Sequence, residues 1–380
     1  VGANAKGGAS IEEGIAPYLG DLAPAAAAMH DTLAALDGDT SDAIAVQTDR
    51  LRRHRRQLIQ LLSDVPIATL LLSKDHQIVL YDGQAAELMA REAAVLLNGS
   101  LFEYLDRDAV LSALERLEAK QATRRPITVK GHSGEIYSGH IRRFENGCYS
   151  LMLDALDSEA ARPLTYDFDL LDTIAATDDG ASSLRDLSFV AFDTETTGLD
   201  PNSDDVVQLG AVRIVNGKRV EGEDFDALVN PGRPIPPQST KVHHISDAMV
   251  AHAPPFSDVC RDFSGFASGS VLIAHNAPFY MAFLRREAAG MEIAFDHTVL
   301  DTVHLSAIVF GGSAEHTLDA LCDRLNIEIP EANRHTALGD AVATAQAFVA
   351  MLPVLESRGL ATLERVLDEC RKHQRILESA

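Results

Sequence analysis

The sequence predicts an α/β protein in which two folded blocks follow a helical segment. Its 380 residues are enough for two or three domains. Between residues 64 and 154, two short apolar strands, helices and three further strands follow one another, which is typical of a small antiparallel α+β domain. After residue 188, apolar strands alternate with longer helices, and the first of these strands runs into a group of acidic residues.

The composition is that of a globular protein with a strongly acidic balance. The chain has 33 Lys and Arg residues against 56 Asp and Glu residues, a formal net charge of -23. This charge argues against a protein that coats duplex nucleic acid, because phosphate neutralisation needs a basic surface. It does not exclude an enzyme that holds one strand end through metal ions.

The cysteines are four in number, lie far apart and form no CxxC pair: Cys148, Cys260, Cys322 and Cys370. This pattern is neither a disulfide framework nor a zinc site, and it fits a reducing compartment. The chain opens on Val1 rather than Met, without a signal-peptide pattern. We therefore expect a cytoplasmic protein, or the cytoplasmic part of a protein that an upstream segment anchors in a membrane.

Residues 1–63 are expected to form a flexible start and then a helical segment that could carry signals. Ile44, Leu51 and Leu58 repeat at intervals of seven residues, which is half of a coiled-coil pattern. The repeat fits a homodimer through these helices, and it fits equally a helix that packs on its own domain.

Residues 64–154 form the small α+β block. Strands are expected at 66–72, 76–81, 127–130, 136–143 and 149–154, and helices at 83–97 and 106–120. The segment DVPIATLLLSKDHQIVLYDGQAAELM (Asp64–Met89), together with the closing strands, resembles a PAS sensor domain. The resemblance implies a PAS ligand, whose identity no residue indicates.

The remaining chain divides into a linker at 155–187, a second domain at 188–355 and a C-terminal helix at 356–380. Within the linker, the apolar-acidic piece YDFDLL (Tyr166–Leu171) is expected to dock on a folded part. In the second domain, strands are expected at 189–192, 206–215, 220–229 and 271–274, and helices at 278–288 and from about 336 to 352.

Two carboxylates follow the first strand of this domain. Asp193 and Glu195 are two residues apart, so on a strand they point to the same face. Like charges side by side are unfavourable unless a cation neutralises them, and oxygen ligands suit Mg²⁺ or Mn²⁺. Taken alone, the pair could equally be an ordinary acidic surface pair.

A third carboxylate, Asp340, begins the last long helix. It is flanked by small residues, which would let a neighbouring strand approach closely. His335 is five residues earlier, about 500° of helical rotation, so the two cannot share one face of a helix. We therefore expect His335 in the entering loop, where it arches back over the site.

Four segments in this order resemble the DEDDh family of 3′–5′ exonucleases, which includes the epsilon subunit of bacterial DNA polymerase III. They are FDTETTGL (Phe192–Leu199), VHHI (Val242–Ile245), AHNAPFYMAFL (Ala274–Leu284) and HTALGD (His335–Asp340). The resemblance implies an RNase H-like fold, a mixed sheet with helices on both faces. It also implies a metal-dependent exonuclease coupled to the PAS-like sensor.

The roles that the resemblance implies fall on matching positions only. Asp193, Glu195 and Asp340 match metal ligands, and His335 matches the general base. Two metal ions are expected, one lowering the pKa of the attacking water and one stabilising the leaving oxygen. Substrate contacts are expected at Thr196, Leu199, His243 and Asn276. His244 replaces the glycine usual in the third position of VHHI, and Phe279 is expected to be a core residue.

The second motif departs from the family, because Tyr280 stands where an aspartate is usual. Tyrosine is neutral at pH 7, so the second metal would lose one charge. Two functions stay open. One is an exonuclease that acts on single-stranded DNA, RNA 3′ ends or short oligonucleotides, with polymerase association as an option. The other is a catalytically weak or inactive fold that binds a nucleotide or strand end as a sensor module.

Overall fold

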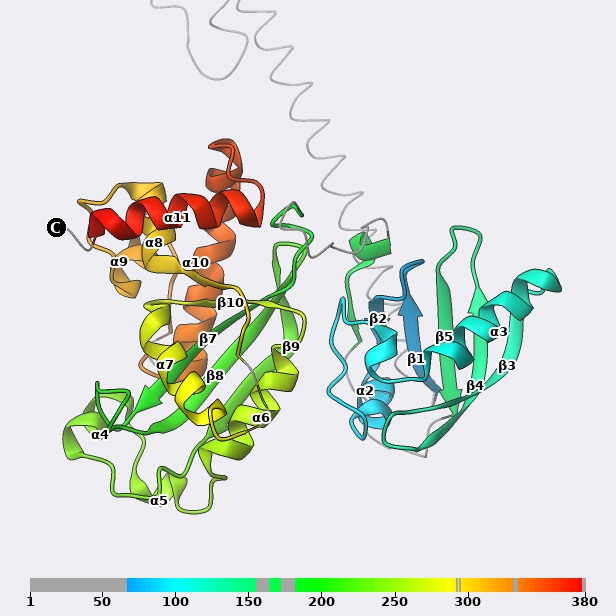
Figure 1. Ribbon diagram of the computed structural model, residues 1–380, viewed down its shortest axis with the longest axis horizontal. Helices are drawn as coiled ribbons and strands as arrows, with labels where there is room; N and C mark the ends of the chain where they lie inside the picture. Colours follow the sequence, from blue (N-terminus) through cyan, green and yellow to red (C-terminus); the bar gives the residue numbers. More distant parts are fainter. Residues whose placement is uncertain are drawn as a thin grey trace, which may run out of the picture. The chain divides into compact units, whose positions relative to one another are not determined.

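A computed structural model of the chain describes residues 67–154, 164–171, 182–291, 293, 295–330 and 334–377. The helical segment expected within residues 1–63, with its seven-residue repeat and the homodimer that depends on it, lies outside the described residues. The residues from Pro66 onward belong to one compact unit, which contains two sheets (Figure 1).

The first sheet has six antiparallel strands in the order β3-β4-β5-β1-β2-β6. Its strands are β1 (Ile67–Leu72), β2 (Ile78–Tyr81), β3 (Arg124–Lys130), β4 (Ile136–Arg143), β5 (Tyr149–Asp154) and β6 (Thr165–Tyr166). Helices α2 (Gly83–Met89) and α3 (Arg107–Ala119) lie between β2 and β3 in the chain. Alternate residues of β1 are buried, as expected for a strand with one face on a core. The predicted antiparallel α+β block is confirmed.

Tertiary contacts change the end of one helix of this block and hold a segment of the expected linker against it. The helix expected over 83–97 ends at Met89, and the backbone of Leu97 instead bonds to two side chains of the second sheet: its N–H donates to Glu223 at 2.7 Å, and its carbonyl accepts from Arg213 at 2.9 Å. The predicted docking of YDFDLL is confirmed, because β6 pairs with β2 and Leu170 is buried in the core of the first sheet.

The second sheet has the order β11-β10-β7-β8-β9. Its strands are β7 (Phe189–Thr196), β8 (Val206–Val215), β9 (Lys218–Leu228), β10 (Val271–Ala274) and β11 (Val299–Asp301). Strands β7, β8 and β9 are antiparallel, whereas β10 is parallel to both β7 and β11. The mixed sheet implied by the resemblance is therefore confirmed.

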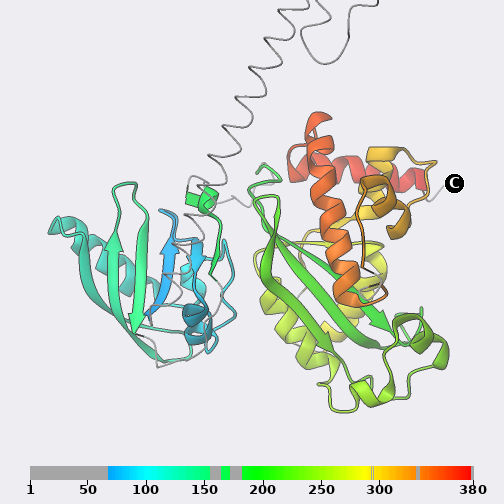
Figure 2. The same cartoon turned by 180° about the vertical axis from the view of Figure 1, so that it is seen from behind.

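Helices cover both faces of this sheet. Helices α6 (Phe256–Phe266) and α7 (Ala277–Ala288) lie on one face, and α10 (Ala337–Ser357) crosses the other, as the two opposite views show (Figure 1 and Figure 2). The aromatic cores follow this division: Phe192 contacts Phe263 of α6 at 5.4 Å between ring centroids, whereas Phe189 contacts Phe348 of α10 at 4.7 Å. The remaining helices are α4 (Pro237–His243), α5 (Asp247–Val250), α8 (Thr302–Phe310), α9 (Leu318–Leu325) and α11 (Leu363–Leu377).

Helix α10 continues to Ser357, beyond the end expected near residue 352, and Gly359 at φ 79° separates it from α11. The C-terminal helix therefore begins later than residue 356. Among the described helices, α10 alone has the length and mean hydropathy, 1.6, that crossing a membrane would need, and 56% of that stretch is buried inside the structure. Its burial is that of a core helix.

The close approach of α10 to the sheet depends on Gly210 of β8. A Cβ atom at this position would lie 2.1 Å from the backbone nitrogen of Leu338 and 2.3 Å from the backbone carbon of Ala337. These are backbone atoms, so a side chain cannot move aside to relieve the contact. The sequence suggested the small residues of the helix as the cause, whereas the closest contact is made by the glycine of the strand.

Replacement of Gly210 by Ala is expected to push the start of α10 away from β8. Overpacking of this kind costs about 1–3 kcal/mol in the free energy of unfolding. Because Asp340 lies in the first turn of α10, we expect the rate of hydrolysis to fall even under conditions in which the variant is fully folded. Chemical denaturation and an oligonucleotide assay measure the two effects. Gly265→Ala, at a helix position where a Cβ meets nothing within 4 Å, is the control, and equal behaviour of both variants would contradict the expectation.

Candidate active site

Three carboxylates meet at the carboxyl end of β7. Asp193 and Glu195 lie on this strand, and Asp340 lies in the first turn of α10. One oxygen from each of the three side chains can be chosen so that all lie within 4.8 Å of one another. Across the part of the chain that the structure describes, no other group of three His, Cys, Asp or Glu side chains meets this criterion.

Backbone pairing holds these side chains in place. In the register of β7 and β8, Asp193 lies opposite Gly210 and Glu195 lies opposite Gln208. The start of α10 is fixed by Thr336, whose side chain accepts a hydrogen bond from the Gly339 N–H at 3.1 Å. The two elements that carry the carboxylates are therefore both anchored independently of any ion.

The carboxylates are electrostatically strained without a cation. Burial, together with the charges of Glu195 and Asp340, raises the pKa of Asp193 well above its usual range. Burial and the charge of Asp340 raise the pKa of Glu195 to about 8. Burial also raises the pKa of Asp340 to about 6, although the charge of His335 acts in the opposite direction. Three hard oxygen donors with elevated pKa values fit a divalent cation such as Mg²⁺ or Mn²⁺.

A metal-free chain should lose stability as the pH rises. Glu195 and Asp340 hold protons in the folded protein at pH values where the unfolded chain has lost them, so the free energy of unfolding falls between about pH 4 and 8. In EDTA, we expect the Tm of the unchanged chain to fall between pH 5.5 and 8. This fall should exceed that of the Glu195→Gln variant by about 5 °C. Glu221→Gln, at an exposed position on β9, is the matched control. Parallel curves for all three proteins would contradict the expectation.

His335 lies in the turn before α10, as the sequence predicts. Its backbone is left-handed at φ 57°, and its side chain is exposed. Its charge lowers the pKa of the nearby Asp340. The imidazole is therefore near Asp340 and accessible to solvent.

Tyr280 lies against the carboxylates from α7. Its hydroxyl donates a hydrogen bond to Asp193, and burial raises its pKa far above the usual value, as does the neighbouring charge of Asp193. Its ring makes edge contacts with Phe192 at 6.2 Å and Phe279 at 5.2 Å between centroids. A neutral, partly buried phenol thus occupies the position where the resemblance places a fourth acid.

The positions expected to contact substrate lie at or just beyond the end of β7, at the end of α4 and at the start of α7. Thr196 ends β7 and donates through its side chain to the Gly198 carbonyl at 2.6 Å, and Leu199 beyond it is 86% exposed. His243 ends α4 and is buried, with its Nδ1 accepting from the Ile245 N–H at 3.1 Å. Asn276 precedes α7 in a left-handed conformation. Phe279 packs partly buried against the core, as predicted.

Two supporting residues were not recognised as such in the sequence. Asp301 caps α8 by accepting from the Val303 N–H at 2.9 Å, and its carboxylate also accepts from the Asn276 and Ala277 N–H groups at 3.0 Å each. It therefore holds the start of α7, the helix of Tyr280. Gln208 links β9 to α10, since its Nε2 donates to Asp226 at 2.8 Å and its Oε1 accepts from the Ala337 N–H at 3.2 Å. Only the fold brings these partners together.

Similarity to known proteins decides the family. A family model described as Exonuclease matches residues 190–348. The DNA polymerase III subunit epsilon of Rickettsia typhi is 38% identical over 176 residues, which cover 45% of this chain and 75% of that protein. The chain belongs to this exonuclease family. The predicted exonuclease domain, with the carboxylates inside the matched range, is thereby confirmed.

Other relatives of the exonuclease domain are longer proteins. A DNA polymerase III subunit epsilon-like protein of Rhodobacter capsulatus is 58% identical over 217 residues, 57% of this chain and 31% of that protein. A DNA polymerase III PolC-type protein of Caldanaerobacter subterraneus is 37% identical over 178 residues, 47% of this chain and 12% of that protein. The chain thus spans less than a third of the length of either relative.

Two solved structures similar to the exonuclease domain are complexes with DNA. Exonuclease X in complex with 5′ overhanging duplex DNA aligns with a TM-score of 0.39 and 28% identity, covering 48% of this chain and 99% of that one. Exonuclease I of E. coli in complex with a dT13 oligonucleotide aligns with a TM-score of 0.39 and 17% identity, covering 45% of this chain and 42% of that one.

Proposed function

We propose that the chain is a metal-dependent 3′–5′ exonuclease that releases nucleotides from the 3′ ends of single-stranded DNA or RNA. The observation that carries this proposal is the convergence of Asp193, Glu195 and Asp340 within 4.8 Å at the end of β7. Membership in the exonuclease family and the epsilon-subunit relatives support it.

Each residue of the site has a role in this proposal. Asp193, Glu195 and Asp340 would hold Mg²⁺ or Mn²⁺, which supplies Lewis-acid activation of water and stabilises charge on the leaving oxygen when bound. His335 would take the proton of the attacking water, for which an exposed imidazole beside Asp340 is suited. Thr196, Leu199, His243 and Asn276 would orient the terminal nucleotide. This is the DEDDh arrangement except at Tyr280.

A second function is favoured by Tyr280 alone. With a neutral phenol bonded to Asp193, the domain would bind a nucleotide or strand end and turn over slowly or not at all. The block at residues 64–154, as a PAS-like sensor of an unidentified ligand, would then either regulate the nuclease or receive its signal. For either function, we propose that the chain associates with a polymerase. We also propose that it lies in the cytoplasm, either free or as the cytoplasmic part of a membrane-anchored protein.

Shortening of a labelled strand tests the proposed function. The chain is incubated with a 5′-labelled single-stranded oligonucleotide and Mn²⁺ or Mg²⁺, and the products are separated by length. A ladder of products that shorten from the 3′ end is expected. Products from the 5′ end, or equal shortening in EDTA, would refute the proposal. Binding without any shortening would favour the second function.

A further inference from the structure

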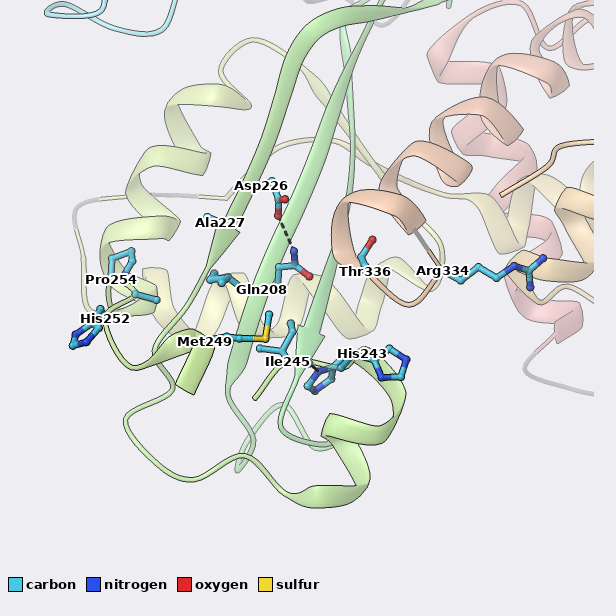
Figure 3. A pocket seen from close by; sticks show the side chains of 13 residues that line it. Gln208, Asp226, Ala227, His243, Ile245, Met249, His252, Pro254, Arg334 and Thr336 are labelled. Carbon is cyan, nitrogen blue, oxygen red and sulfur yellow. Dashed lines mark hydrogen bonds between the residues drawn. The ribbon is translucent and has the colours of Figure 1, made fainter. Parts of the chain in front are cut away.

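A groove with a volume of about 850 Å³ opens beside the carboxylates, over strands β8 and β9 (Figure 3). Gln208 and Asp226 lie on its floor. One side is formed by the segment around α5, including Met249 and His252, and the other by the turn before α10, including Arg334. The volume falls within the range of about 300–1,000 Å³ that is usual for ligand pockets.

The groove is continuous with the candidate active site. Gln208 lies opposite Glu195 in the register of β7 and β8, so the groove begins on the strand next to that of Glu195, and neighbouring strand backbones are about 4.8 Å apart. Its other side ends at Thr336, which caps the helix of Asp340. A strand whose 3′ end lies at the carboxylates would therefore have this groove directly beside it.

The lining suits unpaired bases and a phosphate backbone. The Met249 side chain is 52% exposed, and His252 is exposed near it, so a flexible thioether and an imidazole ring are both available for stacking on base faces. Arg334 is exposed on the opposite side. Among the described residues that line the groove, Asp226 is the only acid, and it accepts a hydrogen bond from Gln208. Although the whole chain has a net charge of -23, the described residues of this groove therefore carry little negative charge.

We propose that this groove binds the segment of a single-stranded polynucleotide directly upstream of the 3′-terminal nucleotide. The inference rests on the proposed function and adds to it a binding site for the nucleotides upstream of the 3′ end. A duplex keeps its bases stacked inside, so their faces would not be available to Met249 and His252. Arg334 contacts the backbone of the same segment, which makes binding sensitive to salt.

Oligonucleotide binding, measured in the absence of hydrolysis, tests the proposed role of the groove. Fluorescence anisotropy in EDTA measures the Kd of a 5′-fluorescein-labelled oligothymidylate of eight nucleotides, and competition against this octamer measures the Kd of thymidine 5′-monophosphate. The double variant Met249→Ala/His252→Ala should bind the octamer about tenfold more weakly, as expected for loss of base stacking. Binding of thymidine 5′-monophosphate, which has no upstream nucleotide, should be unchanged. Hydrolysis of thymidine 5′-(p-nitrophenyl phosphate), which has no upstream segment, should also be unchanged.

Matched arginines test the contact with the backbone. Arg334 pairs with Asp319 at 3.3 Å, and Arg261 pairs with Asp258 at 3.2 Å, both in exposed positions. Arg334→Ala should weaken octamer binding and reduce its dependence on salt, whereas Arg261→Ala should do neither. Unchanged octamer binding in the groove variants, equal losses for thymidine 5′-monophosphate and octamer, or a blunt duplex bound as tightly as the single strand would each overturn the inference. Absence of hydrolysis would refute the proposed function and leave this binding test intact.

Discussion

Replacement of Asp193 by Asn is expected to reduce shortening of a single-stranded oligonucleotide by on the order of 10³-fold. Asp193 is the most buried of the three carboxylates, and it lies between Glu195, Asp340 and the hydroxyl of Tyr280. Its replacement removes a charged ligand while leaving the shape of the strand end nearly unchanged. The affinity for Mn²⁺, measured by calorimetry, should fall with the activity.

The same replacement should stabilise the metal-free protein. A buried carboxyl with a strongly raised pKa favours the unfolded state at neutral pH, because unfolding lets it ionise freely. In EDTA at pH 7.5, the Tm of Asp193→Asn should therefore exceed that of the unchanged chain. Asp262→Asn, at an exposed position on α6, is the matched control and should alter neither property. Equal Mn²⁺ affinity in Asp193→Asn and the unchanged chain would contradict the assignment of this metal site.

Replacement of Tyr280 by Asp is expected to raise hydrolysis by about 10²–10³-fold. The phenol is neutral and bonded to Asp193, so it adds no negative charge to the site and restricts one of the carboxylates. An aspartate at the same position on α7 would add the missing charge and free the space of the ring. The Mn²⁺ stoichiometry of the chain should rise along with its rate.

Two further variants separate the effects of Tyr280. Tyr280→Phe removes the hydrogen bond to Asp193 but keeps the ring against Phe192 and Phe279. Tyr280→Ala removes the ring without adding charge. If Ala and Asp give equal gains, steric blockage is the whole cause and the missing charge has no part in it. If no variant shortens a strand from its 3′ end with Mg²⁺ or Mn²⁺, the domain is a binding module.

Short-range patterns in the sequence predicted most of the elements. The apolar runs of β1, β7 and β8 depend on neighbours within a few residues, and the structure has all three strands. The helix expected over 83–97 was wrong beyond Met89. There, the backbone of Leu97 bonds to Arg213 and Glu223, an ion pair in which both side chains are 2% exposed. Hydrogen bonds from distant residues outweighed local helix propensity.

The sequence by itself determined the chemistry of the site: which residues carry carboxylates, that Asp193 and Glu195 share a strand face, and that His335 precedes the helix of Asp340. Only the tertiary structure decided that the three acids meet, because β7 and α10 are about 140 residues apart and α10 packs closely on the neighbouring strand β8 at Gly210. It also decided that Asp301 holds α7 and that a groove adjoins Glu195. Contacts of this kind depend on close packing between distant segments, and no local periodicity encodes them.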